Sequence, residues 1–93
     1  ILPITEVETA FYLRMRAVDK PGVLADVTRI LGDRSISIEA FLQKEPAKAG
    51  SDVDIIMLTQ RVRQGNMNEA IAAIEQLDSI CGSVTSLRVE ALN

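Results

Sequence analysis

The sequence has no histidine, no tryptophan, one cysteine and 3% aromatic residues. Without histidine, the chain lacks the most frequent general base and metal ligand. A single cysteine, Cys81, cannot form an internal disulfide and is typical of a reducing, cytoplasmic compartment. Few aromatic side chains leave few surfaces for stacking nucleic-acid bases. No apolar run approaches the roughly 20 residues that span a bilayer, and no secretory signal pattern is present.

Recognisable catalytic and cofactor motifs are also missing. The chain has no glycine-rich phosphate loop, no CxxC pair and no HExxH helix, and its acidic residues do not form an obvious catalytic pair. We therefore expect a non-catalytic chain that holds no metal and no cofactor of its own.

The composition predicts one small acidic domain. The chain has 93 residues, of which 47% are hydrophobic, and a net charge of −3. The acidic balance disfavours nucleic acid and anionic membranes as partners. A domain of this size buries only about 60–65% of its unfolded surface, so self-association would add burial. Because the sequence begins with Ile1 rather than Met, we expect it to be a piece of a longer protein.

The first half of the chain predicts a strand, a helix and a second strand. Residues 1–10 show no clear periodicity and are interpreted as a linker or N-terminal arm. Apolar residues alternate over 11–18, with Arg14 and Arg16 on a solvent-facing side. Helical spacing follows over 23–31, and Gly32 marks the expected helix end. Alternation over 36–43 predicts the second strand.

The second half predicts a strand, a helix and a final strand. The run 53–59 is apolar on both faces because of Ile56 and Leu58. This indicates that another surface contacts the outer side of the sheet. Asn66 is expected to cap the second helix, with Glu69 completing a capping box. Alternation over 87–91 predicts the last strand; Val84 is out of phase and marks either a bulge or the strand start.

The order strand, helix, strand, strand, helix, strand predicts an α+β, ferredoxin-like βαββαβ sandwich. Its four-stranded antiparallel sheet would carry two helices on one face. Such a sheet can bind RNA through aromatic residues on its central strands. Only Tyr12 and Phe41 are candidates here, so this function is not expected.

The segment Asp19-Lys20-Pro21-Gly22-Val23-Leu24 joins the first strand to the first helix. Proline suits a helix's first turn, and glycine lets a ligand or another backbone approach closely. The free N–H groups of the helix would then suit a small anion such as a carboxylate. On local chemistry alone, we favour a plain strand-to-helix turn as the interpretation of this segment.

The run Ala17 to Asp26, followed by Ile36-Ser37-Ile38, resembles the ACT domain, a family of amino-acid-sensing regulatory modules with this fold. The resemblance covers about residues 11–92, so residues 11–93 are assigned to an ACT regulatory domain. Runs such as Phe11-Tyr12-Leu13-Arg14, Gln43-Lys44-Glu45-Pro46 and Ile56-Met57-Leu58-Thr59 are most similar to the C-terminal region of bacterial homoserine dehydrogenases. Those oxidoreductases use NAD(P) in threonine and methionine biosynthesis and are inhibited by L-threonine.

The resemblance implies a ligand site between two ACT domains. One copy would supply Asp19, Pro21, Gly22, Val23 and Leu24, and the other would supply Ser37 and Ile38. This implies binding of a small amino acid, L-threonine, by a dimer or higher assembly. Many family members carry Asn at the positions of Asp19 and Ser37, and both replacements keep hydrogen-bonding capacity.

Two alternatives stay open. One is a ligand-free module that only assembles subunits. The other is the ACT domain of a different enzyme of amino-acid metabolism, such as aspartate kinase or phosphoglycerate dehydrogenase.

Overall fold

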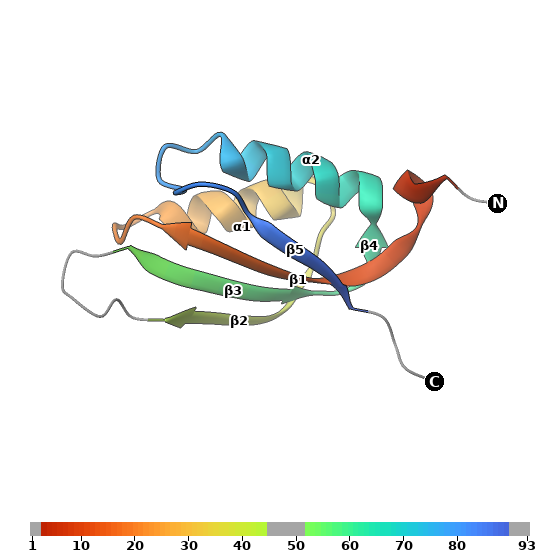
Figure 1. Ribbon diagram of the computed structural model, residues 1–93, viewed down its shortest axis with the longest axis horizontal. Helices are drawn as coiled ribbons and strands as arrows, with labels where there is room; N and C mark the ends of the chain where they lie inside the picture. The colour runs from red at the N-terminus through yellow and green to blue at the C-terminus, as the bar shows by residue number, and fades with distance from the viewer. Residues whose placement is uncertain (1–2, 45–51, 90–93) are drawn as a thin grey trace.

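The computed structural model describes residues 3–44 and 52–89 as a two-layer sandwich (Figure 1). A short 3-10 helix, η1 (Ile4–Glu6), precedes the first strand. The remaining elements in chain order are β1 (Glu8–Ala17), α1 (Val23–Asp33), β2 (Ile38–Lys44), β3 (Val53–Thr59), β4 (Val62–Arg63), α2 (Gln64–Glu75) and β5 (Thr85–Val89). The predicted ferredoxin-like order is confirmed, with the two-residue β4 as an addition.

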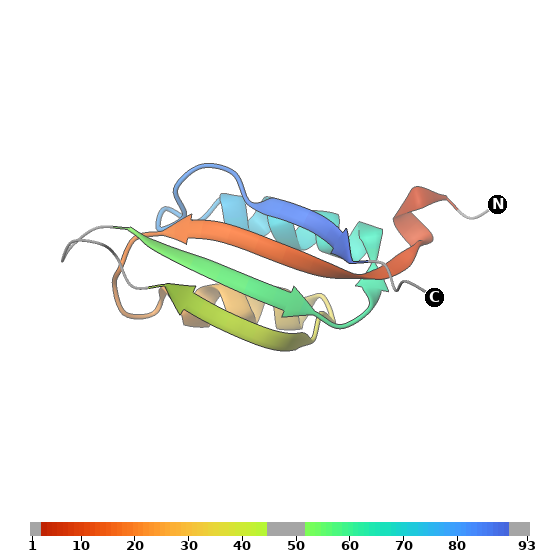
Figure 2. The ribbon, with the colours of Figure 1, turned by 60° about the horizontal axis from the view of Figure 1, so that its bottom comes forward.

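The sheet is antiparallel, and both helices lie on one side of it (Figures 1 and 2). Its main strands run β2-β3-β1-β5, and β4 pairs with the beginning of β1. β1 is central: Leu13 pairs with Met57 of β3 on one side and with Ser86 of β5 on the other. β2 is an edge strand with exposed residues except for the half-buried Ile38.

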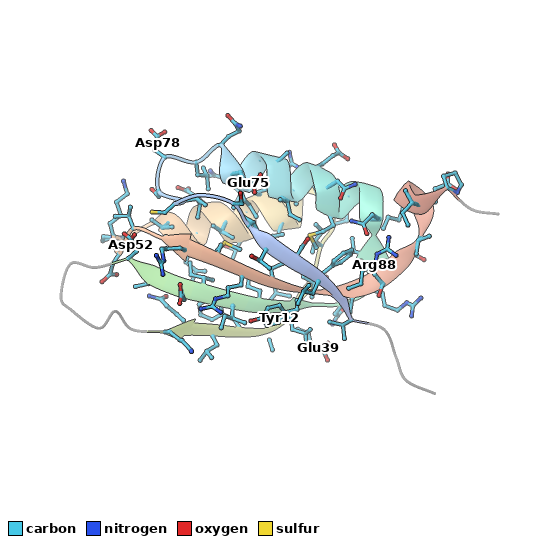
Figure 3. All side chains as sticks on the ribbon, in the orientation of Figure 1. Tyr12, Glu39, Asp52, Glu75, Asp78 and Arg88 are labelled. Atoms are coloured by element: carbon cyan, nitrogen blue, oxygen red, sulfur yellow. The ribbon has the colours of Figure 1, made fainter. Side chains whose placement is uncertain are left out.

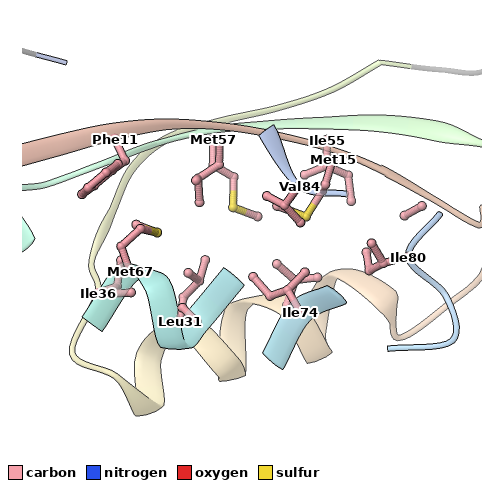
Figure 4. Close-up of a cluster of buried hydrophobic side chains, with 14 of the residues drawn as sticks. Phe11, Met15, Leu31, Ile36, Ile55, Met57, Met67, Ile74, Ile80 and Val84 are labelled. Carbon is pink, nitrogen blue, oxygen red and sulfur yellow. The ribbon is translucent and has the colours of Figure 1, made fainter. Parts of the chain in front are cut away.

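The core lies between the helices and one face of the sheet (Figure 4). Alternate residues of β1 and β3 point into it, among them Leu13 and Met57, which are fully buried. Burial of a large apolar side chain stabilises the fold by about 1.5–3 kcal/mol. Each helix contributes an apolar stripe: Val23, Val27 and Leu31 from α1, and Met67, Ala70 and Ile74 from α2.

The predicted end of α1 at Gly32 is wrong, because the helix continues through Asp33. Ser35 instead takes the left-handed conformation, with φ 59°. The N–H of Ser35 donates to Gly32 O, and the N–H of Ile36 donates to Leu31 O, both at 3.0 Å. This pattern is a Schellman motif, in which the buried Ile36 and Leu31 provide the apolar contact. The second strand therefore starts at Ile38 rather than at residue 36.

The predicted cap of α2 is also wrong. The helix starts at Gln64, and its N-cap residue, Arg63, makes no side-chain capping bond. Asn66 lies inside the helix, where its Nδ2 donates to Arg34 O at 3.2 Å. Gln64 N–H donates to Val7 O at 2.8 Å, so the residue before β1 satisfies one of the N–H groups that have no acceptor within the helix. Tertiary pairing has replaced the local cap.

Strand boundaries differ from expectation at both ends of the chain. β1 begins at Glu8, inside the expected arm, because Glu8 and Thr9 pair with Arg63 and Val62. β5 runs over Thr85–Val89, and Val84 is a buried residue immediately before it. The rest of the expected final strand, Glu90 and Ala91, lies outside the described residues.

Candidate functional site

The turn between β1 and α1 presents its polar residues to solvent. Asp19, Pro21 and Gly22 are exposed. Gly22, with φ 89°, is the N-cap residue of α1 and provides no side-chain cap. Pro21 therefore stands one residue before the cap, rather than in the first turn as expected. The first hydrogen bond of the helix runs from Asp26 N–H to Gly22 O at 3.0 Å. The three preceding N–H groups have no acceptor within the helix.

Two of the predicted site residues in this turn face the core. Val23 is 5% exposed, and Leu24 is partly buried and packs against the core cluster. Their side chains hold the helix end in place, so only their backbone N–H groups are available to a ligand. Asp19 is the charged acceptor of this turn, while the N–H groups are its donors.

The second predicted segment lies at the opposite end of α1 (Figure 1). Ser37 is exposed, and its carbonyl accepts a 2.9 Å hydrogen bond from Gln60 N–H. Ile38 is partly buried against the core. An 11-residue helix is about 16 Å long, so the turn and Ser37 do not meet within one chain. A site that uses both segments needs a second copy.

The outer face of the sheet carries a second group of candidate residues. In β1 and β3, Tyr12, Ile56 and Leu58 are half-buried, while in β2 and β5, Leu42 and Leu87 are 55% and 57% exposed. Strand register places Leu87, Tyr12, Leu58 and Ala40 in one row, next to Ile56 and Leu42. Tyr12 lies on the side of the sheet away from the helices (Figure 3). We call Tyr12, Leu42, Ile56, Leu58 and Leu87 the outer patch. The second apolar face expected for β3 is confirmed.

An ion-pair cluster borders the outer patch. Arg14 Nη2 donates to Asp54 Oδ2 at 3.1 Å, and Arg16 Nε lies 3.7 Å from Asp54 Oδ1. The hydrogen bond from Arg14 holds the pKa of Asp54 below its usual value. The sequence pattern placed the two arginines on a solvent-facing side without a partner. Asp54 was missed as their partner, although its place in the alternation of residues 53–59 puts it on the outer face.

Cys81 lies close to this cluster. Burial of its thiol, together with the neighbouring Asp52 carboxylate, raises the pKa of Cys81. The thiol is therefore protonated at neutral pH and is a poor nucleophile. Among the described residues, no three His, Cys, Asp or Glu side chains are grouped to hold a metal ion. The helices of the described segments are too short and too polar to cross a bilayer.

Comparison with known proteins gives consistent matches. The ACT domain family matches residues 11–79. A homoserine dehydrogenase of Methylobacillus glycogenes is 62% identical over the whole chain, which covers 23% of that enzyme. A crystal structure of a homoserine dehydrogenase from Thiobacillus denitrificans matches 96% of this chain, with a TM-score of 0.85 and 54% identity, and this match covers 19% of that protein.

A more distant structure shares only the fold. The regulatory subunit of aspartate kinase from Thermus thermophilus matches 87% of the chain with a TM-score of 0.64 and 21% identity, and the match covers 53% of that subunit. The present chain thus spans about a fifth of the homoserine dehydrogenases that it resembles. By its family match and its fold, the chain belongs to the ACT domain family.

Proposed function

We propose that the chain is the amino-acid-sensing C-terminal regulatory domain of a homoserine dehydrogenase and that it mediates feedback inhibition by L-threonine. The observation that carries this proposal is the 62% identity to such an enzyme over the whole chain. The parent enzyme would be a cytoplasmic oxidoreductase in threonine biosynthesis. Its NAD(P) would be held outside this chain, because the turn after β1 has one glycine and an acidic residue, Asp19, where a dinucleotide turn needs several glycines.

The turn has chemistry that suits an amino acid. The free N–H groups at the start of α1 would bind the ligand's carboxylate, and Asp19 would accept hydrogen bonds from its ammonium group. Ser37 of a second copy would reach the ligand's hydroxyl group. Binding regulates the enzyme if threonine prefers one arrangement of the two copies over another.

The outer patch supports self-association. Patches of this kind on small domains mark interaction surfaces, because leaving them in water is unfavourable. An antiparallel arrangement of two copies would also bring the turn of one chain toward the Ser37 end of the other. We therefore propose a dimer or a higher assembly as the state that binds threonine.

Calorimetry with L-threonine tests the turn. Removing a charge-assisted hydrogen bond costs about 1.5–3 kcal/mol, so Asp19→Ala should weaken binding about ten- to a hundredfold. Glu69→Ala is the matched control, because Glu69 is an exposed acid of α2 away from the turn. Unchanged affinity in Asp19→Ala would place the ligand elsewhere.

Mixing two variants tests whether two copies share the site. Asp19→Ala and Ser37→Ala chains each lose one half of every site in their own dimers. A mixed dimer regains one intact site, so mixing should restore part of the threonine binding. If the site lies within one chain, mixing restores nothing.

Sedimentation velocity tests the outer patch. Leu87→Lys should shift the chain to monomer while its far-UV circular dichroism stays unchanged. Ile4→Lys is the control, since Ile4 is 58% exposed but lies in η1 outside the patch. If the wild type stays monomeric at high concentration with and without threonine, the dimer proposal is wrong. If the chain assembles but binds neither L-threonine nor any other amino acid tested, it is a ligand-free assembly module.

A further inference from the structure

The segment 34–37 joins α1 to β2 in a strained backbone conformation. Among the described residues, Ser35 is the one non-glycine residue with a positive φ, at 59°. The left-handed conformation is unfavourable for residues other than glycine, because Cβ lies too close to a neighbouring carbonyl oxygen. An extended Ser35 would relieve this strain, but it would also turn Ser37 in another direction. The observed position of Ser37 therefore needs contacts that hold Ser35 left-handed.

Hydrogen bonds from three elements hold the segment 34–37. The Schellman motif, which includes Ser35 N–H, ties it to the end of α1. Gln60 N–H, directly after β3, donates to Ser37 O at 2.9 Å. The third bond comes from α2, where Asn66 Nδ2 donates to Arg34 O at 3.2 Å. In the described part of the chain, Asn66 provides the side chain that connects this segment to the second helix.

Asn66 makes this bond across the two helices rather than within its own. It lies in the first turn of α2, beside the point where the chain leaves α1 (Figure 1). Asparagine is a poor helix former, and its side chain usually bonds nearby backbone groups at a cap. Arg34 is the C-cap residue of α1, and carbonyls at a helix end lack an acceptor role within the helix. Asn66 thus satisfies a free carbonyl three residues before Ser37.

We propose that Asn66 is a positioning residue for the ligand site shared by two copies. By holding Arg34 O, it keeps Ser35 left-handed and Ser37 directed toward the ligand, without touching the ligand itself. This inference rests on the proposed function. It adds a residue of α2 to a site that otherwise consists of the two ends of α1. Because the Asp19 turn lies at the other end of α1, loss of Asn66 should damage only the Ser37 half of each site.

Calorimetry with L-threonine measures the effect of removing the bond. Asn66→Ala should weaken threonine binding about three- to tenfold, because one neutral hydrogen bond no longer favours the binding conformation. Asn68→Ala is the matched control, since the Asn68 side chain accepts a 2.8 Å hydrogen bond from Gln64 of the same helix. This control should bind threonine like the wild type. Wild-type affinity in Asn66→Ala would overturn the proposal.

A second substitution tests whether Asn66 acts through Ser35. Glycine adopts a positive φ without strain, so Ser35→Gly should favour the observed conformation even when Asn66 is absent. The double variant Asn66→Ala/Ser35→Gly should therefore regain most of the threonine affinity lost in Asn66→Ala. If Ser35→Gly restores no affinity, Asn66 does not act by holding this segment, and the proposal is wrong.

Mixing variants separates positioning from general damage to the chain. Asn66→Ala chains mixed with Asp19→Ala chains should regain part of the threonine binding, because one site of the mixed dimer has both halves intact. Asn66→Ala mixed with Ser37→Ala should regain none, since both chains lack the same half. A chain damaged as a whole would regain nothing with either partner, and this result would overturn the proposal.

The reference mixture is Asp19→Ala with Ser37→Ala. If this pair regains binding but the Asn66→Ala pair with Asp19→Ala does not, the role of Asn66 is wrong and the shared site stands. If the reference pair also regains nothing, or if the wild type binds no threonine, the proposed function is wrong and the role of Asn66 falls with it. The two failures therefore give different results.

Discussion

The two faces of the sheet are built from the same strands but differ in what covers them. On the helix side, Leu13 and Met57 are fully buried, and their neighbours interlock with both helices. On the outer side, Tyr12 and Ile56 share the surface with exposed leucines and an ion-pair cluster. The inner face determines that the chain folds, whereas the outer face retains apolar and charged groups beyond what folding needs. Function is therefore to be sought on the outer face and at the ends of α1.

The largest expected difference between the faces is in stability. Leu13→Ala removes a fully buried side chain of the central strand and should lower the free energy of unfolding by about 2–5 kcal/mol. Leu87→Ala, on the outer face, should change it by about 0.5 kcal/mol or less. Urea unfolding of both variants at a concentration where the chain is monomeric measures the contrast. Equal losses would mean that the outer face belongs to the core of the protomer.

A smaller effect is expected at Thr59, whose hydroxyl group is fully buried on the inner face. Thr59 Oγ1 accepts a 3.1 Å hydrogen bond from Phe11 N–H and donates to Gln60 O at 2.9 Å. Thr59→Val keeps the shape but leaves the Phe11 N–H unpaired, which should cost about 1–3 kcal/mol. Thr28→Val, in an exposed turn of α1, is the control and should cost less. A neutral Thr59→Val would show that water or a shifted backbone satisfies Phe11.

The smallest effect is expected at Asp54, on the outer face. Its pKa in the folded chain lies below the ordinary value of 3.8, so its ion pairs stabilise the fold above that pH. This contribution is lost as the pH falls through the lowered pKa of the folded state. The difference in melting temperature between the wild type and Asp54→Asn should therefore be present at pH 7 and shrink below pH 4. Asp33 makes no ion pair among the described residues, so the same comparison with Asp33→Asn should show a weaker pH dependence. If the difference for Asp54→Asn grows in acid, the predicted direction of the pH dependence is wrong.

The sequence predicted those elements whose signal is local. Alternation predicted the bounds of β3, and helical spacing over 23–31 predicted most of α1, because burial on one face imposes a period on the residues. The turn was correctly placed between β1 and α1 for the same reason. Which residues of this turn bind an amino acid, and which amino acid they bind, remains a prediction.

The sequence failed where distant segments decide the structure. At the start of α2, Gln64 N–H donates to Val7 O. The side chain of Asn66, which was expected to cap the helix, instead donates to Arg34 O after α1. Ser35 adopts a conformation usually given to glycine, so Gly32 was a misleading signal. Val84 N–H donates to the Glu75 carboxylate at the end of α2, a contact that no periodicity reveals.

The central position of β1 also has a consequence for the order of assembly. The first strand of the chain needs two neighbours, and the second of them, β5, is the last strand. During synthesis, the hydrogen-bond ladder of β1 stays incomplete until residues 85–89 have been made. Contacts so distant in sequence slow folding and leave strand edges open to wrong partners. A circular permutant that begins at Val53 and rejoins the original ends would place β5 directly before β1 and shorten this wait.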